Sequence, residues 1–122
     1  MGTPRADGDS PAVTVGPLVV AKLGDAVTTV VGLAFVPGLV ETNPAVRLAI
    51  HHAGVLLGVA VGTVLSVVVV VAVAEAGSAA VRRLAEDDWA PPLVRAVGYY
   101  PPAVVFCAAA ANNAALIARV AA

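Results

Sequence analysis

Six polar residues stand inside two stretches of this chain that are otherwise almost entirely apolar. They supply one ammonium, one carboxylate, two hydroxyls and two amides, from Lys22, Asp25, Thr28, Thr29, Asn112 and Asn113. A carboxylate among hydroxyls and amides can bind an ion or carry a proton, whereas the same groups bonded to one another only join helices. The residue types therefore leave two hypotheses open, an ion or proton site and a structural polar seam.

The polar residues of the first stretch share one face of a helix. At 100° per residue, Lys22, Asp25, Thr28 and Thr29 lie within an arc of about 120°. An ionised carboxylate at this depth in a membrane costs about 3 kcal/mol, so we expect Asp25 to be paired or neutral and to face protein. Lys22 is close enough along the helix to pair with it. A threonine hydroxyl can donate to a backbone carbonyl one turn back.

The composition places these residues in a membrane protein. The 122 residues are 60% hydrophobic and 12% charged, whereas soluble domains carry about 25% charged residues. We expect the lipid bilayer to surround the middle of the chain. The net charge of −1 and the absence of a basic run argue against nucleic acid as a partner. Cys107 is the only cysteine, which excludes an internal disulfide.

Three apolar stretches predict an all-α transmembrane bundle of three helices, with spans at about residues 17–36, 53–74 and 99–118. Pro17 suits the first turn of the first helix and Pro37 ends it. Asn43 and Pro44 predict an N-cap and first turn, so the second helix is expected to run from about residue 44 to about 75. Pro101 and its neighbour either kink the third helix or start it at Pro102, and the later start is preferred.

The remaining segments connect these spans. Residues 75–92 are charged and are expected to form a short helical extension or interfacial segment between the second and third helices. Residues 1–15 are expected to form a disordered N-terminal tail, and residues 16–122 a single domain. Orientation follows from the basic residues near the spans, which are Arg5, Lys22, Arg82, Arg83 and Arg95 on one side and Arg47 and Arg119 on the other. This asymmetry predicts a multi-pass protein of the cell membrane with a cytoplasmic N-terminus.

The second helix carries small residues at strict four-residue spacing: Gly54, Gly58, Gly62 and Ser66. This pattern predicts close packing against another helix, either of the same chain or of a second copy. Arg47 and His51 are expected to project from the same face as these glycines, in the two turns before them. His51 and His52 lack a third ligand at matching spacing, so no metal site is predicted.

The turn before the second helix forms a polar corner. Asn43 is expected to cap the helix, and Glu41 to reach its free N–H groups or Arg47. The sequence leaves two interpretations of this corner: a purely structural turn, or an ion site that also includes Arg47 and His51.

The motifs D-x-x-T-T, from Asp25 to Thr29, and E-x-N-P, from Glu41 to Pro44, followed by asparagine in the last helix, resemble a known family. It comprises small multi-pass membrane proteins common in halophilic archaea and is known only as a domain of unknown function. The resemblance covers about residues 18–118. It implies a membrane location and a compact helical domain, and it supplies no reaction.

Two functions are expected to compete. The first is a structural or interaction role through helix–helix packing, with a homo-oligomer or a larger membrane protein as partner. The second is an oligomeric component for transport of an ion or small solute, which uses Asp25 and the threonine and asparagine residues within the membrane. Neither a catalytic constellation nor a cofactor motif is present, so we do not expect an enzyme.

Overall fold

The computed structural model describes residues 11–122, which form four helices in the order α1 (Pro11–Phe35), α2 (Pro44–Ala53), α3 (Val55–Leu84) and α4 (Ala90–Ala121). Three segments of these helices are long and apolar enough to cross a membrane, namely Val15–Phe35, Val55–Leu84 and Ala90–Ala121. The predicted all-α class with three candidate spans is therefore confirmed. At 10 residues, α2 is about 15 Å long and too short to span a bilayer.

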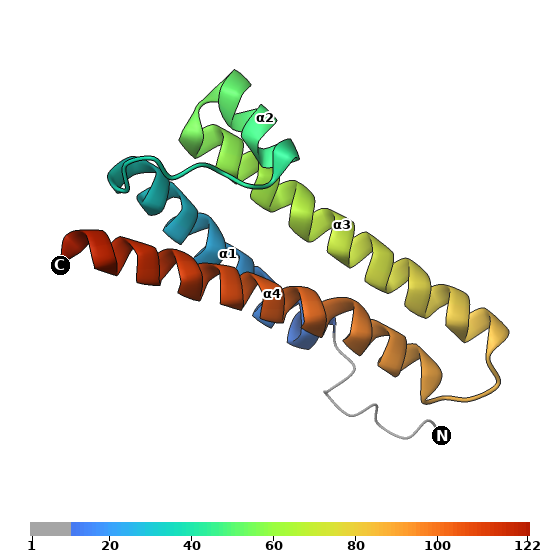
Figure 1. Ribbon diagram of the computed structural model, residues 1–122. Coiled ribbons are helices and arrows are strands. Elements are labelled where there is room, and N and C mark those ends of the chain that lie inside the picture. The colour runs from blue at the N-terminus through green and yellow to red at the C-terminus, as the bar shows by residue number, and fades with distance from the viewer. Residues whose placement is uncertain (1–10) are drawn as a thin grey trace.

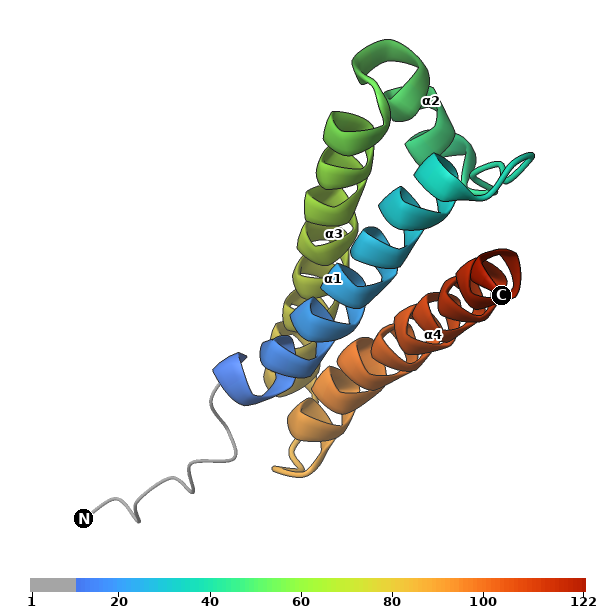
Figure 2. The same ribbon diagram turned by 90° about the vertical axis from the view of Figure 1, so that its left-hand side faces the viewer.

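The three long helices run up, down and up (Figure 1). α1 and α4 lie side by side and parallel, with the Cα of Gly24 facing Ala110 and that of Gly32 facing Ile117. α3 runs in the opposite direction. It approaches α4 closely near the turn that joins them and diverges from it toward the other end (Figures 1 and 2).

A small core lies where all three long helices meet. Its buried members are Leu18 and Ala21 of α1, Ala74 of α3, and Tyr99 and Ala103 of α4. Most other large apolar side chains are exposed. Leu56 and Val104, for example, are 74% and 66% accessible. Such faces are suited to contact with acyl chains, because hydrocarbon does not penalise exposed apolar groups.

The predicted second helix is in fact two helices. Gly54 ends α2 with φ of +85°, a backbone conformation that glycine adopts without strain. The chain reverses there, and α2 folds back along the first turns of α3 (Figure 1). The prediction of one helix from residue 44 to about 75 was wrong, because the sequence pattern did not distinguish a helical glycine from a reversal.

The bounds of the other helices also differ from the prediction. α1 begins at Pro11, so Pro17 lies inside it and not in its first turn, and the first residues of α1 belong to the stretch predicted as tail. Residues 1–10 of that tail lie outside the described residues. α4 runs without interruption through Pro101 and Pro102, so the preferred start at Pro102 was wrong. Proline is tolerated inside membrane helices, where neighbouring groups satisfy the freed carbonyls.

The connection between α3 and α4 is shorter than expected. α3 continues to Leu84, which confirms that the first part of residues 75–92 extends the second span, and α4 begins at Ala90. The N–H of Ala85 donates to the carbonyl of Val81 and ends the α-helical hydrogen bonding. Only residues 85–89 separate the two helices, so a short turn joins α3 and α4 as an antiparallel pair.

Candidate functional site

The ionic pair on α1 forms as the sequence spacing predicts. Lys22 Nζ donates to Asp25 Oδ2 over 2.8 Å, and both side chains are largely buried, at 12% and 14% exposure. The Lys22 ammonium also lies 4.5 Å from the ring centroid of Phe106 on α4. A carboxylate and the negative face of an aromatic ring therefore stabilise the one cationic group of the seam.

An amide on α4 joins the threonines of α1. Asn113 Nδ2 donates to the hydroxyl oxygens of Thr28 and Thr29, over 3.3 and 3.1 Å. Thr28 in turn donates to the carbonyl of Gly24 over 2.8 Å, one turn back. Thr29 lies 3.5 Å from Asp25 Oδ1, at the limit of a hydrogen bond. These contacts bring α1 and α4 together through a continuous polar seam.

Asn112 does not take part in that seam. Its side chain is exposed, and the part of the chain that the structure describes offers it no hydrogen-bond partner. The two adjacent amides therefore have different environments: Asn113 faces α1, and Asn112 faces the space beside α4.

This space is a cavity of about 470 Å³ beside the seam. It is lined by α1, α3 and α4 and by the turn before α2. Figure 2 shows that α3 and α4 diverge toward this turn. The polar lining of the cavity comes from the three long helices and from the turn before α2, namely Lys22, Asp25, Thr29, Glu41, Thr42, Asn43, Thr63, Asn112 and Asn113. The hydroxyl oxygen of Thr63 is inaccessible and, within residues 11–122, has no hydrogen-bond partner. A buried hydroxyl without a partner costs about 1–3 kcal/mol.

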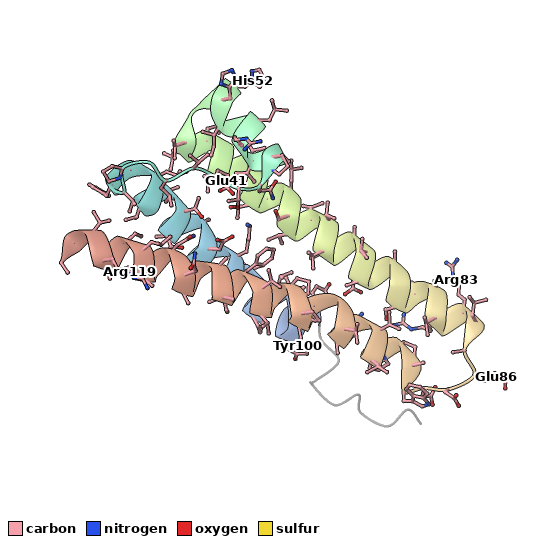
Figure 3. The ribbon with its side chains drawn as sticks, in the orientation of Figure 1. Glu41, His52, Arg83, Glu86, Tyr100 and Arg119 are labelled. Carbon is pink, nitrogen blue, oxygen red and sulfur yellow. The ribbon has the colours of Figure 1, made fainter. Side chains whose placement is uncertain are left out.

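The corner residues form the roof of the cavity. Asn43 Oδ1 accepts from the N–H groups of Ala45 and Val46, over 3.0 and 3.4 Å, and so caps α2. Glu41 Oε1 accepts from the N–H of Asn43 over 2.9 Å. Glu41 lies beneath the turn, on the side that faces the long helices (Figure 3). Pro44 opens α2 as predicted.

The basic members of the predicted corner lie elsewhere. Arg47 and His51 are exposed on α2 and do not line the cavity. His51 and His52 contact each other edge to face, with ring centroids 5.3 Å apart, and His52 projects from the far end of α2 (Figure 3). Among the described residues there is no group of three or more His, Cys, Asp or Glu side chains that could hold a metal. The structure therefore places Glu41 and Asn43 in the lining of the cavity and leaves Arg47 and His51 outside it.

A family model described as a domain of unknown function, DUF5658, matches residues 17–108. This chain belongs to the DUF5658 family. No curated protein and no solved structure matches the chain. The DUF5658 match includes the ion pair of α1, the corner and the whole of α3, and ends before the two amides of α4. Membership agrees with the resemblance to an uncharacterised family, and it assigns no activity.

Within the DUF5658 match, Gly58 and Gly62 of α3 pack against α2 of the same chain. A Cβ on Gly58 would lie 2.6 Å from the backbone of Ile50, and one on Gly62 would lie 2.8 Å from a methyl of Val46. Ser66 donates to the carbonyl of Gly62 over 2.7 Å. Gly54 is the reversal itself, so Arg47 and His51 do not extend this face; that prediction was wrong because it assumed an unbroken helix.

The same DUF5658 region contains a second polar cluster, which the sequence analysis missed. Glu75 of α3 accepts from Arg95 over 2.8 Å and from the hydroxyl of Tyr99 over 2.7 Å. Nearby, the buried hydroxyl of Ser78 donates to the carbonyl of Pro91 over 3.2 Å. Arg95 and Tyr99 stand four residues apart and so share one helix face, which was the available signal. Arg95 was considered only as a charge that sets orientation.

Proposed function

We propose that this chain is a small integral membrane protein that associates with other membrane helices, either of a second copy or of a larger partner. The exposed amide of Asn112 carries the proposal. It stands within a candidate span, next to the residue that bonds α1. In hydrocarbon an amide gains from a hydrogen bond across helices, so a partner that meets this face of α4 stabilises the complex.

The glycines of α3 are not the docking surface in this proposal. Gly58 and Gly62 already face α2, at distances that leave no space for a second helix. The association surface is instead the side of α4 that carries Asn112, which is exposed and borders the cavity where α3 and α4 diverge.

The substitution Asn112→Leu tests the association, because it removes the amide and keeps a similar volume. We expect self-association, or capture of a partner, to weaken by about threefold to thirtyfold, the equivalent of 0.6–2 kcal/mol for one interhelical hydrogen bond. Crosslinking in native membranes and native mass spectrometry from detergent measure it. Val20→Leu, an apolar exchange at an exposed position of α1, is the control. A chain that stays monomeric and binds no membrane protein, with or without the amide, contradicts the proposal.

The cavity favours a second function, transport of an ion or small solute. A polar cavity next to an ion pair in membrane-spanning helices is typical of solute pathways. Three helices do not enclose a pore, so this function requires more than one copy. Flux into liposomes measures it, and we expect Asp25→Asn to reduce the flux. The transport function would be contradicted by flux equal to that of empty liposomes, or by flux that this substitution leaves unchanged.

Placement in the membrane is part of the proposal. We infer a multi-pass protein of the cell membrane, with its N-terminus and the α3–α4 connection in the cytoplasm. Arg82 and Arg83 stand in the last turn of α3, close enough to the membrane to influence orientation. Labelling of single cysteines introduced at Glu86 and at Thr42, after replacement of Cys107, tests it with an impermeant reagent. We assign the chain no catalytic reaction and no cofactor, and the resemblance to proteins of halophilic archaea stays a prediction.

A further inference from the structure

Oxygen atoms that accept hydrogen bonds or bind cations border much of the cavity. Asp25 Oδ1 has only the long contact with Thr29, and the hydroxyl of Thr63 has no partner among residues 11–122. The amides of Asn112 and Asn113 add carbonyl oxygens. Carboxylate, hydroxyl and amide oxygens are the ligands that hard cations prefer.

The charge of the cavity lining selects the ligand. Three lining residues carry charge, namely Lys22, Asp25 and Glu41. The ammonium of Lys22 is already paired with Asp25 and stacked on Phe106, so one negative charge, that of Glu41, stays uncompensated within the lining. A monovalent cation makes the site neutral, whereas a divalent cation or an anion leaves net charge in a region of low dielectric, which is costly.

We propose that the cavity between α1, α3 and α4 binds a small monovalent cation, with Glu41 supplying the negative charge and Asp25 Oδ1 a further carboxylate oxygen. The hydroxyl of Thr63, whose oxygen is inaccessible and has no partner among residues 11–122, turns toward the bound cation as a neutral ligand. The inference deepens the transport function and rests on the same cavity. Binding and flux are nevertheless separate properties, since a site can hold a cation without releasing it across the membrane.

Equilibrium binding to the purified full chain in lipid nanodiscs tests the site. Sodium chloride and potassium chloride are titrated separately against choline chloride at constant ionic strength, with sodium-23 relaxation and calorimetry as measurements. We expect saturable binding of at least one of the two ions. Absence of saturable binding of both ions to the unaltered chain overturns the proposal.

The substitution Glu41→Gln removes the uncompensated charge and keeps an oxygen for the N–H of Asn43. We expect it to weaken cation binding about tenfold, the effect of one charge at short range in a partly polar environment. Glu86→Gln is the matched control, because Glu86 is exposed and lies at the opposite end of the molecule (Figure 3). Equal weakening by both substitutions would show a nonspecific charge effect and would overturn the site.

The substitution Thr63→Val keeps the shape of the side chain and removes the hydroxyl. We expect about threefold weaker binding, because one neutral ligand is lost. Circular dichroism and gel filtration identify a misfolded variant, and Glu41→Gln then still tests the site. Saturable binding without flux would contradict the transport function and support the cation site. Flux without saturable binding would contradict the cation site and support the transport function.

Discussion

The two ends of α4 both hold polar groups, but their surroundings differ. Near the α3–α4 turn, Tyr99 is fully buried and donates to Glu75, which Arg95 also contacts. At the other end, Asn113 contacts α1 beside a cavity of about 470 Å³ in which the hydroxyl of Thr63 lacks a partner. The first end is closed, because its helices meet in the buried core and its buried hydroxyls are bonded, and a separate cavity of about 540 Å³ lies beside the turn beyond that core. The second end is open, because α3 and α4 diverge there.

Small residues account for the difference. At the closed end, Gly98 brings α4 so near to α3 that an added Cβ would lie 2.6 Å from the Cβ of Ala74. At the open end, the glycines of α3 face Ile50 and Val46 of α2 instead of α4. α3 therefore lies close to α4 where Gly98 stands between them, and diverges from α4 where Gly58 and Gly62 face α2 instead.

The largest effect is expected for Gly98→Ala, which places a methyl group against the backbone and side chain of Ala74. We expect a loss of about 3 kcal/mol in stability, because close-packed helices have little freedom to separate. Unfolding by SDS in mixed micelles measures it. Gly16→Ala is the matched control, because a Cβ there meets nothing within 4 Å, and this exchange is expected to be neutral or slightly stabilising. Similar losses for both would contradict the packing argument.

A smaller effect is expected when Glu75 is replaced by Gln, which removes the charge that Arg95 contacts. Because the side chains of Glu75 and Arg95 are 35% and 17% exposed, water partly compensates, and we expect a loss of about 1–2 kcal/mol. Tyr99→Phe should cost about 1 kcal/mol by removing the other hydrogen bond. The same unfolding assay measures both. A stable Glu75→Gln variant would show that apolar packing alone closes this end.

At the open end, Asn113→Leu is expected to lower the stability of the single chain by about 1 kcal/mol, since it removes the contacts with Thr28 and Thr29. Asn112→Leu should leave that stability unchanged and weaken association. Unfolding at low protein-to-detergent ratio separates the two properties. Equal effects of the two exchanges on the single chain would mean that the amides do not have separate roles.

The smallest effects come from two hydroxyls. Ser78→Ala removes a buried hydrogen bond to the carbonyl of Pro91, and we expect it to lower the stability by about 1 kcal/mol. Thr63→Val removes a hydroxyl that has no partner among residues 11–122. In buffer without sodium and potassium, we expect this exchange to leave the stability unchanged or to raise it by up to about 1 kcal/mol. Comparison of the two unfolding midpoints checks this. A destabilising Thr63→Val exchange without either ion would mean that the open end satisfies its polar groups after all.

Local features of the structure were predictable from the sequence. The pairing of Lys22 with Asp25 and the bond from Thr28 to a carbonyl one turn back depend only on positions along one helix. The capping of α2 by Asn43 depends on adjacent residues. The three spans follow from apolar stretches long enough to cross a bilayer.

Contacts between helices were not predictable in the same way. The seam shows this. From the sequence, either of two adjacent amides could bond to α1, and only the rotation of α4 directs Asn113 toward it. The cluster around Glu75 shows it again, because the residues that meet are 20 and 24 positions apart. A small difference in the rotation or tilt of a helix changes which side chains meet.

The sequence by itself determined the class of this protein, its three apolar spans and the bonds that form within one turn, because these depend on composition, length and helical periodicity. Tertiary structure alone decided that Gly54 reverses the chain, that Gly58 and Gly62 of α3 pack against α2, and that α3 and α4 diverge. Those outcomes depend on which helix surfaces fit together in space, and the resulting cavity with its polar lining exists only once that packing is made.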